Sequence, residues 1–375
     1  MRVKTSKVNA GTEFIKKYTF QLGINPKNSH KISKKALSGH PSIMADLCRK
    51  PSKVCKKLTL KFVFQIKMSG HSGAKIALII IGFLIYCITV VLNYLSTGDI
   101  IPGLFRNRTG DIADAFYVSA TPAGWTFAVI WATIYFWNLA WFIYALTTVC
   151  RRDDNGHYIY QLNILSPLFF ISFIINNCAV VAWLFLWDRQ YLNWALLVIA
   201  FTPLTLYISL FISFRRLYGK LNYLSKAGAV KDIWLTRIFV HNGLAFFATW
   251  VSIATLLNFA IVLTYYWSVE MQVSVSIALG ILSFLIITWF LLDTFAIDKF
   301  VRYTVTPYIV VVVALVGSVQ KNFDLEDNYR NSIFLVVLLA VAGVLLLLKL
   351  VIMFVRACRI PINGNAGDDL KGTLA

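Results

Sequence analysis

Eight long apolar runs constrain the fold of this chain more than any other feature. A transmembrane helix needs about 20 mostly apolar residues, and the runs that meet this need are 76–96, 126–149, 164–187, 192–214, 238–267, 273–296, 304–320 and 333–355. The seventh run is short and contains Pro307. The runs are continuous, without the alternation of a membrane β-barrel, and only a helix satisfies its backbone polar groups internally. The sequence therefore predicts an all-α, polytopic membrane helix bundle of about eight transmembrane helices.

The composition agrees with a membrane protein and offers no catalytic pattern. The chain is 58% hydrophobic and 14% charged, whereas soluble domains contain about 25% charged residues. It contains no HExxH, GxSxG or P-loop, and no paired carboxylates within a predicted span. The six cysteines form no CxxC pair, so neither a disulfide framework nor a zinc site is indicated. We therefore expect a protein that is not an enzyme, with no catalytic residues, metal site or cofactor.

The basic charge is concentrated before the first span. Residues 1–67 carry 16 Lys and Arg against two acids, and the remaining 308 residues are only slightly basic. Attraction to anionic lipid headgroups explains such a tail, and nothing in it resembles a nucleic-acid-binding fold, so no nucleic-acid partner is expected. Its high charge predicts a disordered, cytosolic segment. Two alternatives stay open: Met68 is the true start, or the tail is a transit peptide.

The loop charges predict the topology. If the N-terminus is cytosolic, the inner loops and the C-terminal end hold 13 Lys and Arg, and the outer loops hold five. This bias follows the positive-inside rule through all eight spans and places both termini in the cytosol. The glycosylation sequon Asn107-Arg108-Thr109 then lies in the first outer loop. The organelle is not indicated.

A few ionisable residues lie within the predicted spans. His241 begins the fifth span and Asp293 ends the sixth, both near the cytosolic rim. Ionisable groups in a membrane are functional candidates. Lys349, seven residues before Arg356, is expected to snorkel to the cytosolic face and to be structural.

The second span is rich in aromatic residues. The stretch TPAGWTFAVIWATIYFWNLAW, residues 121–141, holds four tryptophans and no charge. Trp125 and Trp141 lie near the two ends of the span, where interfacial anchoring explains them. Trp131 and Tyr135 are four residues apart and share a helix face. They either line a pocket or pack against a neighbouring helix.

Four asparagines in the second, third and fifth predicted spans are candidates, namely Asn138, Asn176, Asn177 and Asn258. Such residues hydrogen-bond across helices, for about 1 kcal/mol or less. The alternative is a polar anchor in a mostly apolar small-molecule cavity.

The second, third and fifth spans resemble the TspO-type translocator family, the tryptophan-rich sensory proteins. The family's Trp-x-Phe-x-x-x-Trp-x-x-x-Tyr pattern is matched without a gap by Trp125, Phe127, Trp131 and Tyr135. The fifth span resembles the family's last helix through Trp250, Leu257, Asn258 and Phe259. The third span is similar through Asn177, with one inserted residue.

The resemblance covers about residues 76–267 and has three departures. Ala128 replaces a motif proline, and no Lys or Arg follows Tyr265 and Tyr266 closely enough for the family's cholesterol-recognition pattern. Three further spans follow the five that the family shares. The expected organisation is a cytosolic tail at 1–67, a TspO-like five-helix module at 68–267, three additional helices within 268–356, and a short cytosolic tail at 357–375.

The resemblance implies a binding function. Family members bind tetrapyrroles, sterols and synthetic aromatic ligands, so we expect a membrane sensor or transporter that binds a flat apolar molecule of the tetrapyrrole, sterol or lipid-like kind. The expected ligand-binding residues are Trp131, Tyr135, Asn177, Trp250 and Asn258. A general secondary transporter or a receptor-like protein without such a ligand is the alternative. The lipid bilayer is the expected partner, and a homodimer stays open.

Overall fold

The computed structural model describes residues 71–98 and 100–359, and within them every regular element is a helix. The expected tail at 1–67 and residues 360–375 of the expected C-terminal tail lie outside these ranges. Seven helical segments are long and apolar enough to cross a membrane: Gly73–Leu95, Gly124–Cys150, Pro167–Asp188, Leu192–Tyr218, Val230–Tyr265, Met271–Ala296 and Tyr329–Arg359. The prediction of an all-α polytopic membrane helix bundle is confirmed.

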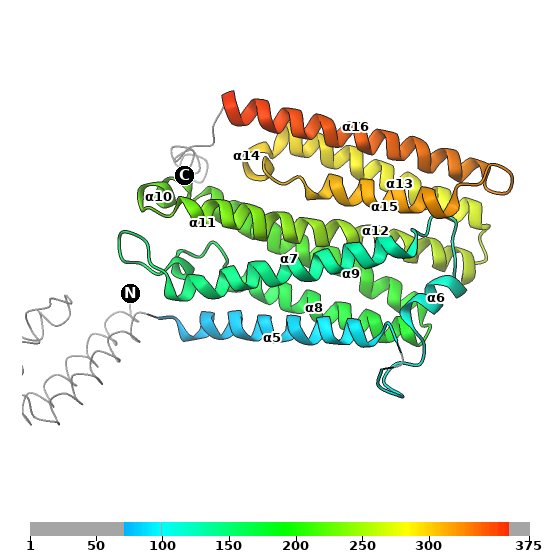
Figure 1. The fold of residues 1–375 in the computed structure, drawn as a ribbon, viewed down its shortest axis with the longest axis horizontal. Coiled ribbons are helices and arrows are strands. Elements are labelled where there is room, and N and C mark those ends of the chain that lie inside the picture. The colour runs from blue at the N-terminus through cyan, green and yellow to red at the C-terminus, as the bar shows by residue number, and fades with distance from the viewer. Residues whose placement is uncertain (1–70, 99, 360–375) are drawn as a thin grey trace, which may run out of the picture. The chain divides into compact units, whose positions relative to one another are not determined.

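The seventh expected span, residues 304–320, is the helix α15 (Thr306–Asn322), which at 17 residues is at the short end of the spanning range and is not among these seven segments. The other long helices are α5 (Gly73–Leu95), α7 (Gly124–Cys150), α8 (Pro167–Asp188), α9 (Leu192–Tyr218), α12 (Asn242–Tyr265), α13 (Met271–Leu291) and α16 (Tyr329–Arg359). Helix α5 begins and α16 ends at the same end of the bundle, on the left in Figure 1. Counting α15, the described chain therefore crosses the bundle an even number of times.

Short elements connect the long helices. They are α6 (Thr109–Ala115), the 3₁₀ turn η1 (Ile159–Leu162), α10 (Leu221–Lys226), α11 (Val230–Leu235) and α14 (Asp298–Val301). Two segments are π-helical: η2 (Thr236–His241) directly precedes α12, and η3 (Leu292–Ala296) directly follows α13. π-Helical turns inside long helices are rare and are often found at functional sites.

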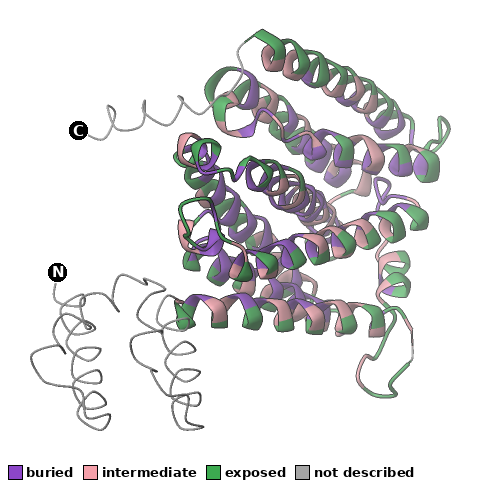
Figure 2. Ribbon diagram, turned by 60° about the vertical axis from the view of Figure 1, so that its left-hand side comes forward, coloured by how far each residue is buried: buried purple, intermediate pink, exposed green. Residues whose placement is uncertain are grey.

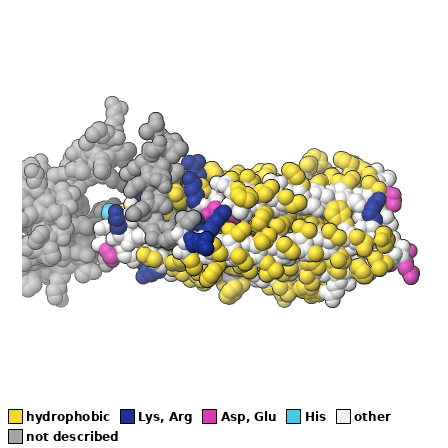
Figure 3. Space-filling model, turned by 90° about the horizontal axis from the view of Figure 1, so that it is seen from above, with side chains coloured by type: hydrophobic (Ala, Val, Ile, Leu, Met, Phe, Trp, Pro, Cys, Tyr) yellow, Lys and Arg dark blue, Asp and Glu magenta, His cyan; other side chains and the backbone are white. Residues whose placement is uncertain are grey.

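Helix α12 lies at the centre of the bundle. It packs against α7, α9, α13 and α15, and its membrane segment is the most buried of the seven. The outer helices α5 and α16 expose one side and bury the other (Figure 2). Figure 3 shows hydrophobic side chains covering one face of the bundle, with Lys and Arg towards its two ends. A continuous apolar belt of this kind is what a bilayer covers.

Pro203 lies inside α9, and a hydroxyl group compensates for the backbone hydrogen bond that it removes. Because proline has no N–H, the carbonyl of Ile199 loses its helical partner. The hydroxyl of Thr202 donates to that oxygen instead, at 2.8 Å. The hydroxyl of Thr255 on α12 lies 3.2 Å from the same oxygen, but its shorter hydrogen bond goes to the carbonyl of Val251 at 2.7 Å.

The three additional helices are joined to the first five by polar contacts. Asn242, the first residue of α12, accepts hydrogen bonds from the backbone N–H groups of Val305 and Thr306 at 2.9 and 3.3 Å. It therefore satisfies N–H groups at the start of α15 that have no helical partner. At the other end of α15, Ser318 donates to the carbonyl of Ala120 at 2.9 Å. The described residues from Gly73 onward accordingly belong to one compact unit.

Candidate functional site

A cavity of about 450 Å³ lies where the additional helices meet the first five. It is bounded by side chains from α9, α12, α13, α15 and α16, and from the segment that contains α14. Its lining contains no charged side chain and is mostly aliphatic and aromatic. Small-molecule sites in proteins are typically apolar cavities of about 300–1,000 Å³. The volume and the lining both fall within that description.

The cavity opens towards the surface that lipid covers. Helices α9 and α13 both pack on α12 but make no extended contact with each other among the described residues. The lining residues include Tyr207 and Phe211 of α9, Leu285 of α13, and Leu292 at the start of η3, and all four side chains are exposed. The exposed side chains show that the cavity is open to the surface between α9 and α13.

Hydroxyl groups on two walls of the cavity are already hydrogen-bonded within the protein. On α12, Ser252 donates to the carbonyl of Ala248 at 2.8 Å, and the hydroxyl of Tyr207 lies 2.9 Å from that of Ser252. Since Ser252 uses its own proton, Tyr207 is the donor of this pair. On α15, the hydroxyl of Tyr308 donates to Oδ2 of Asp293 at 2.7 Å.

An ion pair lies directly behind the wall formed by Tyr308. Asp293 belongs to the π-helical segment η3, and its Oδ1 lies 2.6 Å from Nζ of Lys349 on α16. Both side chains are almost completely buried. The expectation that Lys349 snorkels to the cytosolic face is therefore wrong. The ammonium group of Lys349 is instead paired with a carboxylate that is itself buried. Removing either group would leave the other as an unpaired buried charge.

A second charge network holds α14, whose Val301 lines the cavity, against α16. Asp298 accepts hydrogen bonds from Nε of Arg302 at 2.9 Å and forms a 3.0 Å ion pair with Arg356. Burial raises the pKa of the Asp298 carboxyl, but the hydrogen bonds from the two arginines outweigh burial and hold its pKa below the ordinary value. The network therefore holds in place the part of the cavity wall that follows the end of α13.

The aromatic residues expected to bind a ligand lie at the contact between α7 and α12. The rings of Trp131 and Tyr135 are stacked at 5.6 Å, and Trp131 contacts Phe247 edge-on at 6.1 Å. Trp250 is completely buried and contacts Phe127 edge-on at 5.3 Å. None of these residues lines the 450 Å³ cavity.

The two expected asparagines are buried and hydrogen-bonded. Asn258 accepts from Nε1 of Trp183 at 3.3 Å and donates to the carbonyl of Ala254 at 2.8 Å. Asn177 donates to the carbonyl of Phe173 within its own helix at 2.9 Å. Neither lines the cavity. The structure thus places Trp131, Tyr135 and Trp250 at the α7–α12 contact and does not gather all five expected residues around the cavity.

His241 lies in the π-helical segment η2 and is also buried. Its Nε2 is 3.0 Å from the hydroxyl of Ser213, and its ring lies 4.2 Å from that of Phe214. Phe214 lines the cavity, whereas His241 does not. The histidine therefore supports the wall from behind.

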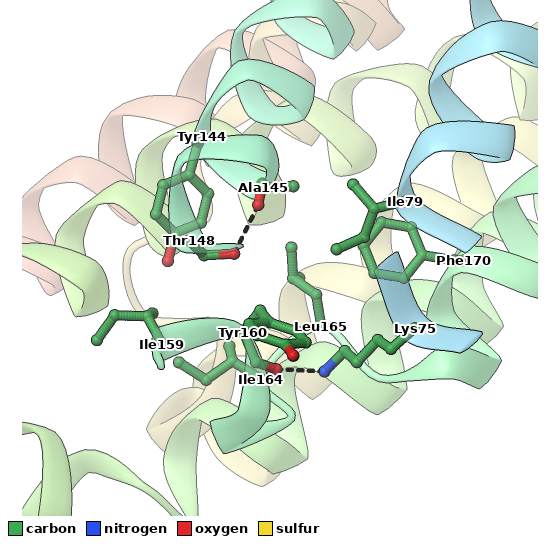
Figure 4. Close-up of a pocket in the computed structure, with 10 residues that line it drawn as sticks. All are labelled: Lys75, Ile79, Tyr144, Ala145, Thr148, Ile159, Tyr160, Ile164, Leu165 and Phe170. Atoms are coloured by element: carbon green, nitrogen blue, oxygen red, sulfur yellow. Dashed lines mark hydrogen bonds between the residues drawn. The ribbon is translucent and has the colours of Figure 1, made fainter. Parts of the chain in front are cut away.

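A second, much smaller space lies beside η1 (Figure 4). Its volume is about 10 Å³, which holds one water molecule at most. Nζ of Lys75 donates there to the carbonyl of Tyr160 and, at 2.8 Å, to Oδ1 of Asn163. These bonds tie the start of α5 to the loop before α8. The space is too small for an organic ligand.

Comparison with known proteins gives one match. A family model described as TSPO-like protein matches residues 79–353. The match extends from α5 into α16 and includes the three helices that lie beyond the five expected from the resemblance. Comparison with curated proteins and with solved structures gave no match. Among the described residues, no group of three or more His, Cys, Asp or Glu could hold a metal ion.

Proposed function

The chain belongs to the TSPO-like protein family, and from this premise we propose that it binds a flat apolar small molecule of the tetrapyrrole, sterol or lipid-like kind. We place the ligand in the 450 Å³ cavity bounded by α9, α12, α13, α15 and α16. The protein is an integral, multi-pass membrane protein of the TspO type. In our proposal it works without enzymatic activity, as a sensor or transporter of this ligand.

The cavity itself carries the proposal. Its lining is apolar and uncharged, and burial of apolar surface contributes about 25 cal/mol per Å². The opening between α9 and α13 supports entry from the bilayer, where an apolar molecule concentrates. Aromatic lining residues such as Phe214 and Trp289 are suited to flat ligands, because stacked rings contribute about 0.5–1.5 kcal/mol beyond their area.

The α7–α12 contact is the alternative position for the same ligand. It contains Trp131, Tyr135 and Trp250, with Asn258 further along α12. Binding there requires these packed rings to separate, since Trp250 is completely buried without a ligand. The cavity needs no such rearrangement.

A secondary transporter of another substrate is the second candidate function. The buried pair Asp293–Lys349 favours it, because ion pairs inside membrane proteins often mark coupling or substrate pathways. Such a protein would not bind flat apolar molecules even without substitution. Removal of the ion pair would abolish its transport activity.

A ligand screen on the purified protein in lipid nanodiscs tests the first proposal. A porphyrin and a sterol are titrated while tryptophan fluorescence and the thermal midpoint are followed. We expect at least one of them to quench the fluorescence and raise the midpoint. Trp131→Phe and Asn258→Ala identify the position: unchanged affinity in both variants supports the cavity, whereas about tenfold weaker binding places the ligand at the α7–α12 contact. Failure of both ligands in both measurements contradicts the proposed function.

A further inference from the structure

Two cations flank the end of the cavity opening at which α13 stops. Arg215 belongs to α9, and its guanidinium carbon lies 5.5 Å from the centre of the ring of Phe211, which is exposed in the opening. Lys299 belongs to α14 and follows Ile297, another lining residue, by two positions. One cation therefore comes from each side of the opening, since α14 continues the chain beyond α13.

The fold brings these two cations to neighbouring positions. Nζ of Lys299 lies 5.5 Å from the centre of the Tyr218 ring on α9, and the ring of Phe300 contacts Tyr218 edge-on at 4.9 Å. Arg215 and Tyr218 are three residues apart on α9, so their side chains share a helix face. Both cations thus lie at the end of the bundle where α16 also ends, on the left in Figure 1.

Neither cation has a counter-ion in the part of the chain that the structure describes. No ion pair there includes Arg215 or Lys299, and both residues are exposed. Asp298, the residue before Lys299, is instead held by Arg302 and Arg356. Two neighbouring like charges repel each other, so an anion bound between them would be stabilised by both.

The apolar opening extends from these cations by about the depth of one lipid leaflet. The lining residues of α13 and η3 run from Leu282 to Leu292, about 15 Å at a rise of 1.5 Å per residue. The hydrocarbon core of a bilayer is about 30 Å thick, so the acyl chains of one leaflet occupy about 15 Å. Cations at one end and an apolar opening of this length match the two parts of a phospholipid.

We propose that this end of the opening binds an anionic phospholipid. Its phosphate accepts hydrogen bonds from Arg215 and Lys299, and one acyl chain lies in the opening against Phe211, Leu285 and Leu292. A guanidinium group pairs well with phosphate oxygens, and a headgroup with a net negative charge is favoured over a zwitterionic one, whose own cation is repelled. The inference goes beyond the proposed function, because it does not depend on which ligand the cavity takes.

A photoactivatable lipid tests the position. The probe is phosphatidylglycerol with a diazirine midway along one acyl chain. The full-length protein is held in mixed micelles of a non-ionic detergent, so that competing lipids can be titrated, and labelled peptides are identified by mass spectrometry. We expect labels on α9 and α13 around Phe211 and Leu285. Unlabelled phosphatidylglycerol should suppress them at about one tenth of the concentration that phosphatidylcholine with the same chains requires.

Substitution of each cation tests the headgroup contact. Arg215→Gln and Lys299→Gln should each reduce the advantage of phosphatidylglycerol about fivefold, which is the effect of one cation near an anionic lipid surface. Arg216→Gln is the matched control. Arg216 is also exposed and follows Arg215 directly, but it lies near Lys75 of α5 and not beside the opening. It should leave the advantage unchanged.

The possible outcomes decide the proposal. Labels on α9 and α13 that depend on both Arg215 and Lys299 support it. Labels spread equally over the exposed sides of α5 and α16 would indicate an unspecific lipid belt and overturn it. Equal suppression by the two lipids, or an equal loss in Arg216→Gln, overturns the assignment of the headgroup. Suppression by glycerol 3-phosphate at the lipid's own concentration would show that the acyl chain contributes nothing, and overturns it as well.

Discussion

Nζ of Lys349 lies 2.6 Å from Oδ1 of Asp293, and the two residues are 56 positions apart in the chain. The pair joins α16 to the π-helical end of α13, and the hydroxyl of Tyr308 occupies the other carboxylate oxygen. The Asp293 carboxylate accepts from both Tyr308 and Lys349, so the additional helices share one polar contact in an otherwise apolar environment. Stability of this part of the bundle should depend on keeping that contact complete.

Replacing Lys349 by methionine should destabilise the protein strongly. The substitution keeps the length of the side chain but leaves Asp293 buried without its counter-ion, which costs about 3–5 kcal/mol. Thermal unfolding in nanodiscs measures the loss. The double variant Lys349→Met/Asp293→Leu is the comparison, because it removes both charges. It should be more stable than Lys349→Met alone; a double variant that is less stable would show that the pair contributes more than charge compensation.

Filling the cavity should abolish ligand binding. Ala342 on α16 lines the cavity and is buried, so Ala342→Phe places a ring in the space that the ligand would occupy. We expect at least tenfold weaker binding, about 1.4 kcal/mol, of any porphyrin or sterol that the unmodified protein binds. Leu347→Phe, on the exposed side of the same helix, is the control and should bind normally. Normal binding by Ala342→Phe would exclude the cavity.

The contact between α7 and α15 depends on the absence of a side chain at Gly317. A Cβ atom there would overlap Oγ1 of Thr126, so Gly317→Ala should separate the two helices and lower stability by about 1–3 kcal/mol. Thr126→Ala in the same chain removes the overlapping atom and should restore most of the loss. Gly343→Ala on α16, where no atom lies within 4 Å, should not destabilise. The thermal midpoints of the unmodified protein and the three variants test this. An unchanged midpoint in Gly317→Ala would contradict close packing of α7 against α15.

The network around Asp298 should make stability fall in acid. Arg302 and Arg356 hold the pKa of Asp298 below its ordinary value, so the folded state binds this proton less readily than the unfolded state. The contribution is complete above the unfolded value of about 4 and is lost as pH falls below it towards the folded pKa. The thermal midpoint of Asp298→Asn should lie below that of the unmodified protein at neutral pH, and this difference should shrink below about pH 4. The exposed Asp111→Asn serves as control; a difference that is constant with pH would contradict the assignment.

Both termini are predicted to be cytosolic, from the distribution of Lys and Arg among the loops. The even number of passes in the described chain supports a common side for the two ends but does not identify that side. A C-terminal tag should be cleaved by protease added to the cytosolic face of sealed vesicles, and a tag in the loop near Asn107 should be protected. The reverse pattern would invert the topology.

The helices could be predicted from the sequence because each is an uninterrupted apolar run, and the structure contains one at every predicted position. The cavity could not be predicted from the sequence. Phe211 and Phe214 lie in the same run of α9, and both line the cavity, one exposed and one buried. A helix that is apolar on all sides gives no sign of which face meets lipid, which meets protein and which meets a space.

The aromatic and polar residues show the same limit. The spacing of Trp131 and Tyr135 predicted a shared face, and their rings are indeed stacked. The ring that Trp131 contacts across the helix interface is Phe247 of α12, more than 100 residues later, and spacing within one helix does not identify it. The distance from Lys349 to Arg356 along the chain predicts a side chain that extends to the cytosolic face. Its actual partner, Asp293, is adjacent only in the folded bundle.

In the proposed function, the opening between α9 and α13 means that occupancy of the cavity follows the concentration of the ligand in the bilayer. A site that exchanges its ligand with the bilayer comes to equilibrium with the mole fraction of that ligand among the surrounding lipids, whatever its total amount in the water. The same quantity of ligand spread over twice the membrane area would occupy the site less. In this proposal, affinities are therefore meaningful per lipid, and the extent and composition of the membrane determine how much ligand is bound.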